Sequence, residues 1–466
     1  MASTDQLRTL EASLPLVAAH AQAIADDFYG RLFTSHPELL RDQFNRGDIA
    51  QGRQQREFAR TLVALAQAVL DAAPRASRAS VGEAGRASSV VSVTPGEDAG
   101  AGASVGTDAD ARQVGAPTLA PATPGEIVSR LAQRHAALGV TRDEYDLFER
   151  HLRDAFAARL GDAFTPAVAD AWAAVHRQAR DEMITTVEAI YRQADLEPGD
   201  DWREALVTER RVEAEDVVAL TLVSADSEAL PTYRAGQFAS VQVRLADGAR
   251  QIRQYSLRGG PDEQWRISAR LLVGVPPAPD GEVSAHLMGE LRVGDVVAVS
   301  PPIGSLTIDD LDDAPLLFVS AGIGCTPVLG MLDHLARSEP DRDVTALHFE
   351  RTPERHAHRV ELEALVAAMP YATLRVCYTQ GSLSALSALA ESSIDGPGVY
   401  LDPIDLGRVD LTPTHRVFLC GPVPFMAIAR AALIAHGVDA DRVHYFVFGP
   451  DDGSVTGADT GQRGLG

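Results

Sequence analysis

The sequence predicts a multidomain fold: an all-α unit, then an antiparallel β-barrel, then a doubly wound α/β unit. Three changes of pattern along the chain support this order. Up to about residue 195, apolar residues recur at helical spacing with no strands between them. From residue 201 to about 308, short runs rich in β-branched residues alternate with turns, as in a small barrel. After residue 315, continuous apolar strands alternate with helices, which is typical of a parallel sheet covered on both faces.

Length, charge and cysteine content limit the classes of protein to consider. At 466 residues the chain is too long for one hydrophobic core. A formal charge of -23 disfavours nucleic acid and anionic membranes as partners, and every basic residue other than histidine is arginine. We find no membrane span and no secretory signal. Three widely spaced cysteines fit a reducing cytosol, so we expect a cytoplasmic protein.

The first part of the chain carries specific helix signals. Ile24, Phe28 and Leu32 recur every four residues and form an apolar stripe. Thr141 followed by Glu144 has the spacing of a capping box, which begins another helix. Several helices of unequal length without strands between them indicate a globin-like or bundle packing.

A stretch from about residue 73 to residue 124 interrupts this helical pattern. It consists mainly of Ala, Gly, Ser, Thr, Pro and Asp, with almost no large apolar residue. Such a segment cannot bury enough surface to offset the entropy of ordering it. We therefore predict a disordered loop inserted into the helical domain.

His135 is the residue with metal chemistry to offer in the helical part. It shares one helical face with Ile127 and Leu131. A lone histidine on an apolar face is more often a core residue satisfied by hydrogen bonds. The alternative is a haem ligand, because haem iron needs one imidazole from an otherwise apolar helix face.

If His135 binds a haem, then Tyr29, Phe44 and Gln55 could line the opposite face of that haem. The Tyr hydroxyl and the Gln amide would donate hydrogen bonds to dioxygen bound there.

Arg253, Tyr255 and Ser256 end a predicted strand and form a candidate flavin site. An arginine can neutralise a pyrophosphate, a tyrosine can lie against an isoalloxazine ring, and a serine can reach a ring heteroatom. An ordinary edge strand is the alternative interpretation. The polar-aromatic pair that ends at Phe238 could border the same ligand.

A short helix is predicted directly after Gly281, and its first turn contains Ser284. The free amides of a helix N-terminus, together with a serine hydroxyl, suit a pyrophosphate.

The apolar strand that begins near Leu316 leads into a loop, Gly322 to Pro327, at a strand-to-helix turn. Two glycines there allow the backbone to approach a phosphate, although the third glycine of the dinucleotide fingerprint is missing. Glu350 closes the next strand, where a carboxylate would hold ribose hydroxyls, whereas the adjacent Arg351 would favour a 2'-phosphate. The choice between NADH and NADPH therefore stays open. Cys420 would lie near a nicotinamide or serve as a small buried hydrophobe.

Taken in order, these features resemble the flavohaemoglobin (nitric oxide dioxygenase) family over nearly the whole chain except the insert and the tail. Arg253 to Ser256, Gly322 to Pro327 and Cys420 to Pro422 are motifs shared with the wider ferredoxin-reductase superfamily. More specific similarities lie at residues 28–33 (FYGRLF), 131–135 (LAQRH) and 444–450 (HYFVFGP).

The resemblance implies domain limits. We expect a globin (haem) domain at 1–195 with the insert at about 73–124, a FAD-binding β-barrel at 200–309, a ferredoxin-reductase-like NAD(P)H-binding domain at 313–450 and a flexible tail at 451–466.

The resemblance also implies site residues. His135 would be the proximal ligand of haem b, Tyr29 and Gln55 would stabilise bound dioxygen, and Tyr145 would orient the ligand histidine together with a glutamate. The expected cofactor contacts are Phe44, Arg134, Phe238, Arg253, Gln254, Tyr255, Ser256, Gly281, Ser284, Gly322, Ile323, Gly324, Cys325, Thr326, Pro327, Cys420, Gly421, Pro422, Phe446, Val447, Phe448, Gly449 and Pro450.

Three positions depart from the family pattern. The proximal glutamate falls on Val187, and the nearest carboxylate, Glu188, lies one residue later, about 100° around a helix. Glu188 could serve only if the helix were locally shifted. Phe446 stands where the family usually has a glutamate near the flavin, and Arg134 replaces a common lysine with the charge kept.

The function that the resemblance implies is nitric oxide dioxygenation, with electrons passing from NAD(P)H through FAD to haem. The expected small-molecule partners are nitric oxide, dioxygen and NAD(P)H. Two alternatives stay open: a flavin-driven peroxide or quinone reductase, and a haem oxygen-binding or sensing protein whose reductase keeps the iron ferrous.

Overall fold

The computed structural model describes residues 2–73, 123–194, 196, 202–226, 228–259, 264–274, 280–309, 312–379, 409 and 411–447. The predicted loop at about 73–124 and the predicted tail at 451–466 thus lie almost entirely outside the described residues. In the part of the chain that is described, no helix combines the length and apolar character that a membrane span requires.

Within its described residues, the N-terminal part consists of helices, with a core that includes Phe28, Phe156 and Trp172. The first helix ends at Ser35, and the second begins at Pro37, where a proline is well suited to a first helical turn. Thr141 and Glu144 form the predicted capping box, in which the Glu144 carboxylate accepts from the Thr141 amide at 2.7 Å. The helices are α1 (Thr4–Ser35), α2 (Pro37–Asp42), α3 (Arg46–Ala50), α4 (Arg53–Ala72), α5 (Pro124–Ala137), α6 (Arg142–Leu160) and α7 (Pro166–Gln193).

The middle part is a six-stranded antiparallel sheet in the order β4-β3-β6-β1-β2-β5. An isolated bridge between Arg258, just after β4, and Arg266 of β5 joins the two edge strands and closes the sheet into a barrel. The predicted helix after Gly281 is α8. These elements are β1 (Arg203–Ala214), β2 (Val217–Ser224), β3 (Phe238–Arg244), β4 (Arg250–Ser256), β5 (Trp265–Arg270), α8 (Glu282–Gly289) and β6 (Val296–Val299).

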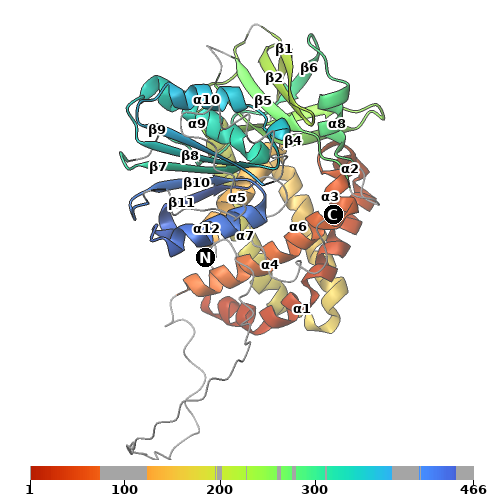
Figure 1. Ribbon diagram of the computed structural model, residues 1–466. Coiled ribbons are helices and arrows are strands. Elements are labelled where there is room, and N and C mark those ends of the chain that lie inside the picture. Colours follow the sequence, from red (N-terminus) through yellow and green to blue (C-terminus); the bar gives the residue numbers. More distant parts are fainter. Residues whose placement is uncertain are drawn as a thin grey trace, which may run out of the picture.

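The described residues of the C-terminal part form a five-stranded parallel sheet in the order β11-β10-β7-β8-β9. Helices α9 and α10 cover one face and α12 the other (Figure 1). Strand order reverses between β7 and β10, which is where ligands bind in doubly wound sheets. These elements are β7 (Leu316–Ala321), α9 (Cys325–Ser338), β8 (Val344–Glu350), α10 (Arg359–Ala367), β9 (Ala372–Tyr378), β10 (Arg416–Cys420), α12 (Val423–Ala435) and β11 (Val443–Phe446). The predicted fold class is confirmed.

The barrel contacts both of the other parts. Strand β4 and the loop around Ile303 pack against the helical part, with Ile303 fully buried in the helical core. Helix α9 packs near β4 from the other side. The predicted flavin strand therefore stands where the two remaining parts of the molecule approach each other.

Candidate functional site

His135 lies two residues before the end of α5, with its Nδ1 atom 2.9 Å from the hydroxyl of Tyr145 on α6. Burial, together with the charge of neighbouring Arg134, lowers the pKa of His135 to about 4. Burial likewise raises the pKa of Tyr145. The pair is therefore a neutral imidazole and a protonated phenol at neutral pH. With Nδ1 engaged by Tyr145, Nε2 is the ring nitrogen that can bind iron.

No carboxylate joins this pair in the described structure. Val187 of α7 is buried in the helical core, and Glu188 points to the outer face, where its Oε1 atom lies 2.6 Å from Arg142 Nη2. Helix α7 runs from Pro166 to Gln193 without an interruption that would rotate Glu188 inward. The condition under which Glu188 could serve the histidine, a local shift of the helix, is therefore not met in the structure. Glu188 forms a surface ion pair instead.

Tyr29 of α1 is buried and accepts a hydrogen bond from Gln54, whose Nε2 lies 3.0 Å from the tyrosine oxygen. Gln55, the residue predicted for this role, donates to the Ile49 carbonyl at 3.2 Å. The structure thus brings Tyr29 together with Gln54 and not with Gln55. Both glutamines open α4, and the sequence holds no signal that decides which of two adjacent residues faces Tyr29.

An aromatic shell surrounds Tyr29. The Phe28 and Phe58 rings stack on each other 4.9 Å apart, and the Phe44 ring meets Tyr29 edge-on at 5.9 Å. Phe148 of α6 joins the same cluster. A single neutral imidazole, a buried phenol with an amide partner and apolar rings form the donor set and lining that haem requires. These residues fit a haem.

Strand β4 carries the predicted flavin residues, and β3 pairs with it so that Phe238 opposes Ser256. Burial raises the pKa of Tyr255, so its phenol stays protonated. Arg253, the residue predicted to meet a pyrophosphate, instead donates through Nη2 to Asn45 Oδ1 at the start of α3, at 2.7 Å. A pyrophosphate at this place would have to replace Asn45.

The predicted pyrophosphate helix, α8, begins after Gly281. The Ser284 hydroxyl donates to the Gly281 carbonyl at 2.9 Å and accepts from the Leu272 amide at 3.0 Å. It therefore ties α8 to the preceding loop. The free amides of the α8 N-terminus are left as the groups that suit an anion.

Two predicted nucleotide loops touch each other. A Cβ atom at Gly324 would lie 2.4 Å from the Cys420 carbonyl oxygen, so only glycine fits there. A Cβ at Gly421 would lie 3.0 Å from the Ala321 side chain. Gly322 adopts φ +57°, the left-handed region that favours glycine. The remaining predicted residues of the first loop follow at once: Ile323 packs against the barrel, Thr326 donates to the Ile323 carbonyl, and Cys325 and Pro327 lie in the first turn of α9.

Cys420 and Cys325 are buried thiols, and burial raises the pKa of Cys325 to about 12 and that of Cys420 further. Both stay protonated at neutral pH. Pro422 precedes α12 and caps its start.

Phe446 pairs with Cys420 in the register of β10 and β11, and it is buried against Phe418. Val447 follows as a partly buried residue. The other predicted contacts of this motif, Phe448, Gly449 and Pro450, lie outside the described residues.

Glu350, expected to bind ribose, has both carboxylate oxygens engaged by protein groups. Oε2 lies 2.9 Å from Arg270 Nη2, and Oε1 accepts from the Arg351 amide at 2.9 Å. Arg270 comes from the barrel, so this ion pair joins the barrel to the parallel sheet beside Gly322.

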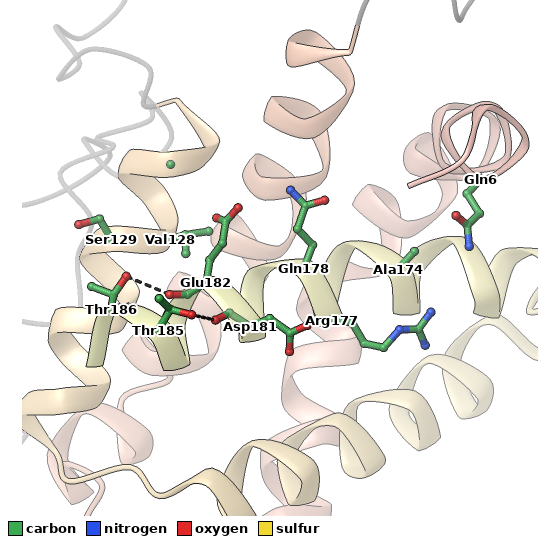
Figure 2. Close-up of a pocket in the computed structure, with 11 residues that line it drawn as sticks. Gln6, Val128, Ser129, Ala174, Arg177, Gln178, Asp181, Glu182, Thr185 and Thr186 are labelled. Atoms are coloured by element: carbon green, nitrogen blue, oxygen red, sulfur yellow. Dashed lines mark hydrogen bonds between the residues drawn. The ribbon is translucent and has the colours of Figure 1, made fainter. Parts of the chain in front are cut away.

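A surface pocket of about 810 Å³ opens between α5, α7 and the start of α1 (Figure 2). None of the predicted site residues lines it. Its polar side chains are partly used within α7, where Thr185 and Thr186 donate to the Asp181 and Glu182 carbonyls. It therefore takes no part in the arrangement around His135.

Family models match three stretches of the chain: Globin at residues 119–183, Oxidoreductase FAD-binding domain at 204–308 and Oxidoreductase NAD-binding domain at 318–431. The chain is 31% identical to the flavohemoprotein of Bordetella pertussis, covering 96% of this chain and 99% of that protein. It is 30% identical to the flavohemoprotein of Chromobacterium violaceum, at 97% and 99% coverage. Among solved structures, the flavohemoglobin of Malassezia yamatoensis with bound FAD and heme superposes with a TM-score of 0.76 at 26% identity, covering 96% and 99%.

Proposed function

We propose that this chain, which belongs to the flavohaemoprotein family, is an NAD(P)H-dependent nitric oxide dioxygenase. Membership of this family supports a general activity, electron transfer from NAD(P)H through FAD to haem within one chain. The specific reaction that we propose is the conversion of nitric oxide and dioxygen to nitrate. The protein would carry out this reaction in the cytoplasm, with small molecules as its partners.

The observation that carries the proposal is that one helical part holds both a candidate iron ligand and a candidate hydrogen-bond donor to bound dioxygen. Nδ1 of His135 lies 2.9 Å from the Tyr145 hydroxyl, so Nε2 is the ring nitrogen left to bind iron. Tyr29 is fixed by Gln54 among aromatic rings. When bound, haem supplies the iron at which dioxygen and nitric oxide react, and FAD divides a two-electron delivery into single electrons.

The residues of this chain have separate tasks in that reaction. His135 would hold the iron and Tyr145 would fix the orientation of the imidazole. Tyr29 keeps its proton because burial raises its pKa, so it is a hydrogen-bond donor over the whole physiological range. The Phe28, Phe44 and Phe58 rings exclude water from the place where Tyr29 donates.

The reductase part would also bind its cofactors through aromatic rings and hydrogen-bond donors that its own strands and helices position. Tyr255 and Phe238 on neighbouring strands offer rings for a flavin, and the α8 amides offer donors for its pyrophosphate. The touching loops at Gly324 and Cys420 would receive the nicotinamide nucleotide at the edge of the sheet.

The test is oxygen uptake by protein loaded with haem and FAD, with NADH supplied and nitric oxide added. We expect nitric oxide to accelerate oxygen uptake, and we expect one nitrate to accumulate for each nitric oxide consumed. Tyr29→Phe should lower the nitric oxide turnover by about tenfold, since one donor to the reacting oxygen is lost. Oxygen uptake that ignores nitric oxide would reject the dioxygenase proposal and leave the electron-transfer chain intact.

One observation favours a second function, oxygen binding with a reductase that keeps the iron ferrous. His135 has a neutral phenol as its partner, whereas a carboxylate would push more electron density onto the iron. A weaker push favours keeping dioxygen over reacting with it. Two results together would support this second function: dioxygen dissociates slowly from the protein, and nitric oxide is turned over more slowly than bound dioxygen exchanges.

A further inference from the structure

The end of the helix that carries His135 is capped from another part of the molecule. The last carbonyls of a helix lack partners within it. At the end of α5, the His135 carbonyl accepts from Leu138 and Val140, and the Ala136 carbonyl accepts from Gly139. The Ala137 carbonyl accepts from the Ser240 hydroxyl of β3, 2.5 Å away.

Ser240 is held rigidly at this place. Its side chain is fully buried, and its backbone amide donates to the Ser300 hydroxyl at 2.9 Å. Its own hydroxyl oxygen also accepts from Gln254 Nε2 at 3.3 Å. Because Gln254 belongs to the predicted flavin motif on β4, one serine hydroxyl links that motif to the histidine helix.

A second contact lies on the other side of His135. Gln133 Nε2 donates to Ser305 Oγ of the barrel at 3.1 Å. Gln133 stands two residues before His135 and Ala137 two residues after it, so barrel side chains hold the helix on both sides of the histidine. The fully buried Ile303 packs into the helical core beside them.

We propose that Ser240 is a positioning residue, whose hydroxyl fixes the His135 helix against the flavin-binding strands and so sets the efficiency of electron transfer between the two halves. This inference rests on the electron-transfer function proposed above, but it does not depend on nitric oxide being the substrate. Its chemistry is a hydrogen bond to a helix-end carbonyl, with the donor oriented by Gln254.

The physical consequence is a continuous connection. From Gln254 the path crosses two hydrogen bonds to Ala137 and then follows two peptide units to His135. Electrons pass more readily along bonds and short hydrogen bonds than across gaps. Without the Ser240 hydroxyl the Ala137 carbonyl would be buried without a donor, and the last turn of α5 would move to find one.

The principal experiment compares Ser240→Ala with Thr221→Val in the full chain loaded with haem and FAD. Thr221 is a buried residue on β2 of the same barrel, and its hydroxyl donates to Glu209 Oε2 at 3.2 Å. In the described structure its side chain makes no hydrogen bond to Ser240 or to α5. After anaerobic mixing with NADH, the flavin absorbance reports reduction of FAD and the Soret band reports the arrival of electrons at the haem.

We expect Ser240→Ala to slow the haem phase by about tenfold and to leave the flavin phase within about twofold. Thr221→Val should leave the ratio of the two rates at its wild-type value. Equal slowing in both variants would mean general loosening of the barrel and would overturn the proposal, as would an unchanged haem phase in Ser240→Ala.

Hydrogen exchange provides a readout that does not depend on activity. Amides of residues 138–140 are protected by the last turn of α5. In Ser240→Ala they should exchange about fivefold faster, whereas amides in the middle of α7 should keep their rates. Unchanged exchange at 138–140 would show that the hydroxyl does not hold the helix end, and would overturn the proposal.

A second pair of variants keeps the test available if Ser240→Ala does not fold. Gln133 is half-buried and Ser305 exposed, so Gln133→Ala and Ser305→Ala should both fold. Each should slow the haem phase about two- to threefold, and the double variant should be no slower than either single one, because they share one contact. Additive slowing would show that the contact between them is not what positions the helix. If the wild type reduces its haem but ignores nitric oxide, the dioxygenase proposal fails and the Ser240 proposal stands.

Discussion

The barrel meets the helical part mainly through hydrogen bonds to backbone carbonyls and to the neutral Asn45 side chain, and it meets the parallel sheet through buried ion pairs. On the helical side, the fully buried Gln251 donates through Nε2 to the Arg41 and Phe44 carbonyls, each at 3.1 Å. Ser240 caps α5 in the same way. Arg253 brings one charged group into this interface, but its partner there is the neutral Asn45. The ion pairs of Arg46 with Asp247 and Glu282 lie at the rim and are partly exposed.

On the nucleotide side, charges are buried within the interface itself. Arg258 of the barrel is almost fully buried, with its Nη1 atom 2.6 Å from Glu361 Oε2 on α10. Ser268 of β5 accepts from Arg258 and contacts His358 Nε2 at 2.9 Å. Arg270 adds the pair with Glu350 described above.

The difference teaches how one barrel can serve two neighbours. A hydrogen bond from a neutral amide to a backbone carbonyl responds little to salt or pH and fixes one geometry. Buried ion pairs hold strongly only while both charges persist, and losing one partner leaves the other uncompensated. The contacts with the helical part thus keep the barrel at a constant distance from that part. The contacts with the nucleotide part can be weakened by changes in pH or salt.

The largest test of this comparison removes one charge from the nucleotide side. Glu361→Gln leaves Arg258 buried with a neutral neighbour, and we expect the free energy of unfolding to fall by about 2–3 kcal/mol, reduced from the full cost because Glu361 is a quarter exposed. Urea unfolding followed by circular dichroism measures it. Glu363→Gln, which removes a surface pair with Arg359 on the same helix, should change stability by about 0.5 kcal/mol or less. Similar losses in the two variants would contradict the contrast.

Gln251→Leu tests the neutral side. It removes two hydrogen bonds to carbonyls that stay buried, and we expect a loss of about 2 kcal/mol in the unfolding of the helical part. Because no charge is involved, the loss should be the same at low and high salt. A loss that shrinks on adding salt would show that this interface too depends on its charges.

Acid should weaken the nucleotide side first. His348 and His356 stack 4.5 Å apart there, and burial, with Arg359, His358 and Arg270 adding to it, lowers the pKa of His356 to about 3. A histidine that is neutral when folded and protonated when unfolded makes the unfolded state bind more protons below about pH 6.5. Its stabilisation is therefore complete above that pH and declines as pH falls toward 3.

The variant His356→Gln isolates this effect. The stability of the wild type should decline more steeply than that of the variant, by about 0.7 kcal/mol per pH unit at pH 6.5 and by about 1.4 kcal/mol per pH unit near pH 5. Glu361, whose pKa is lowered to about 2, contributes in the same direction only below its ordinary range and stays outside this window. His20→Gln, which removes an exposed imidazole from α1, controls for the loss of one titratable group. Parallel curves for wild type and His356→Gln would refute the assignment.

The smallest effect is expected at the rim of the helical side. Arg46→Ala removes two partly exposed ion pairs and should cost about 0.5–1 kcal/mol at low salt and less at high salt. Stability measured at two ionic strengths checks this. A cost above that of Gln251→Leu would mean that the rim ion pairs, and not the neutral hydrogen bonds, stabilise this interface most.

Local sequence signals were sufficient to predict several of the helices and strands, whereas strand β1 was not predicted. The capping box at Thr141, the helix start at Pro37 and the helix after Gly281 all follow from local chemistry, which acts within a few residues. The order of the three parts follows from the change of period. Their contacts could not be predicted, because side chains far apart in the sequence make them.

The site shows the same limit. The predicted pairing of His135 with Tyr145 appears in the structure, since both face inward on adjacent helices. Gln54 in place of Gln55 depends on how α4 is rotated about its axis, which tertiary packing sets. Arg253 is bound by Asn45, 208 residues earlier, a contact that no local pattern predicts.

The absence of lysine from the sequence bears on the nucleotide side. Arg258, Arg270 and Arg355 supply the cations there, and a guanidinium keeps its proton far above the range in which an ammonium group would discharge. Protonation of carboxylates and histidines destabilises that interface at low pH. Its arginines stay protonated at high pH, so they do not destabilise it there. The contact between barrel and nucleotide sheet therefore responds to pH in one direction: acidification can loosen it, and alkalinisation leaves its cations as they are.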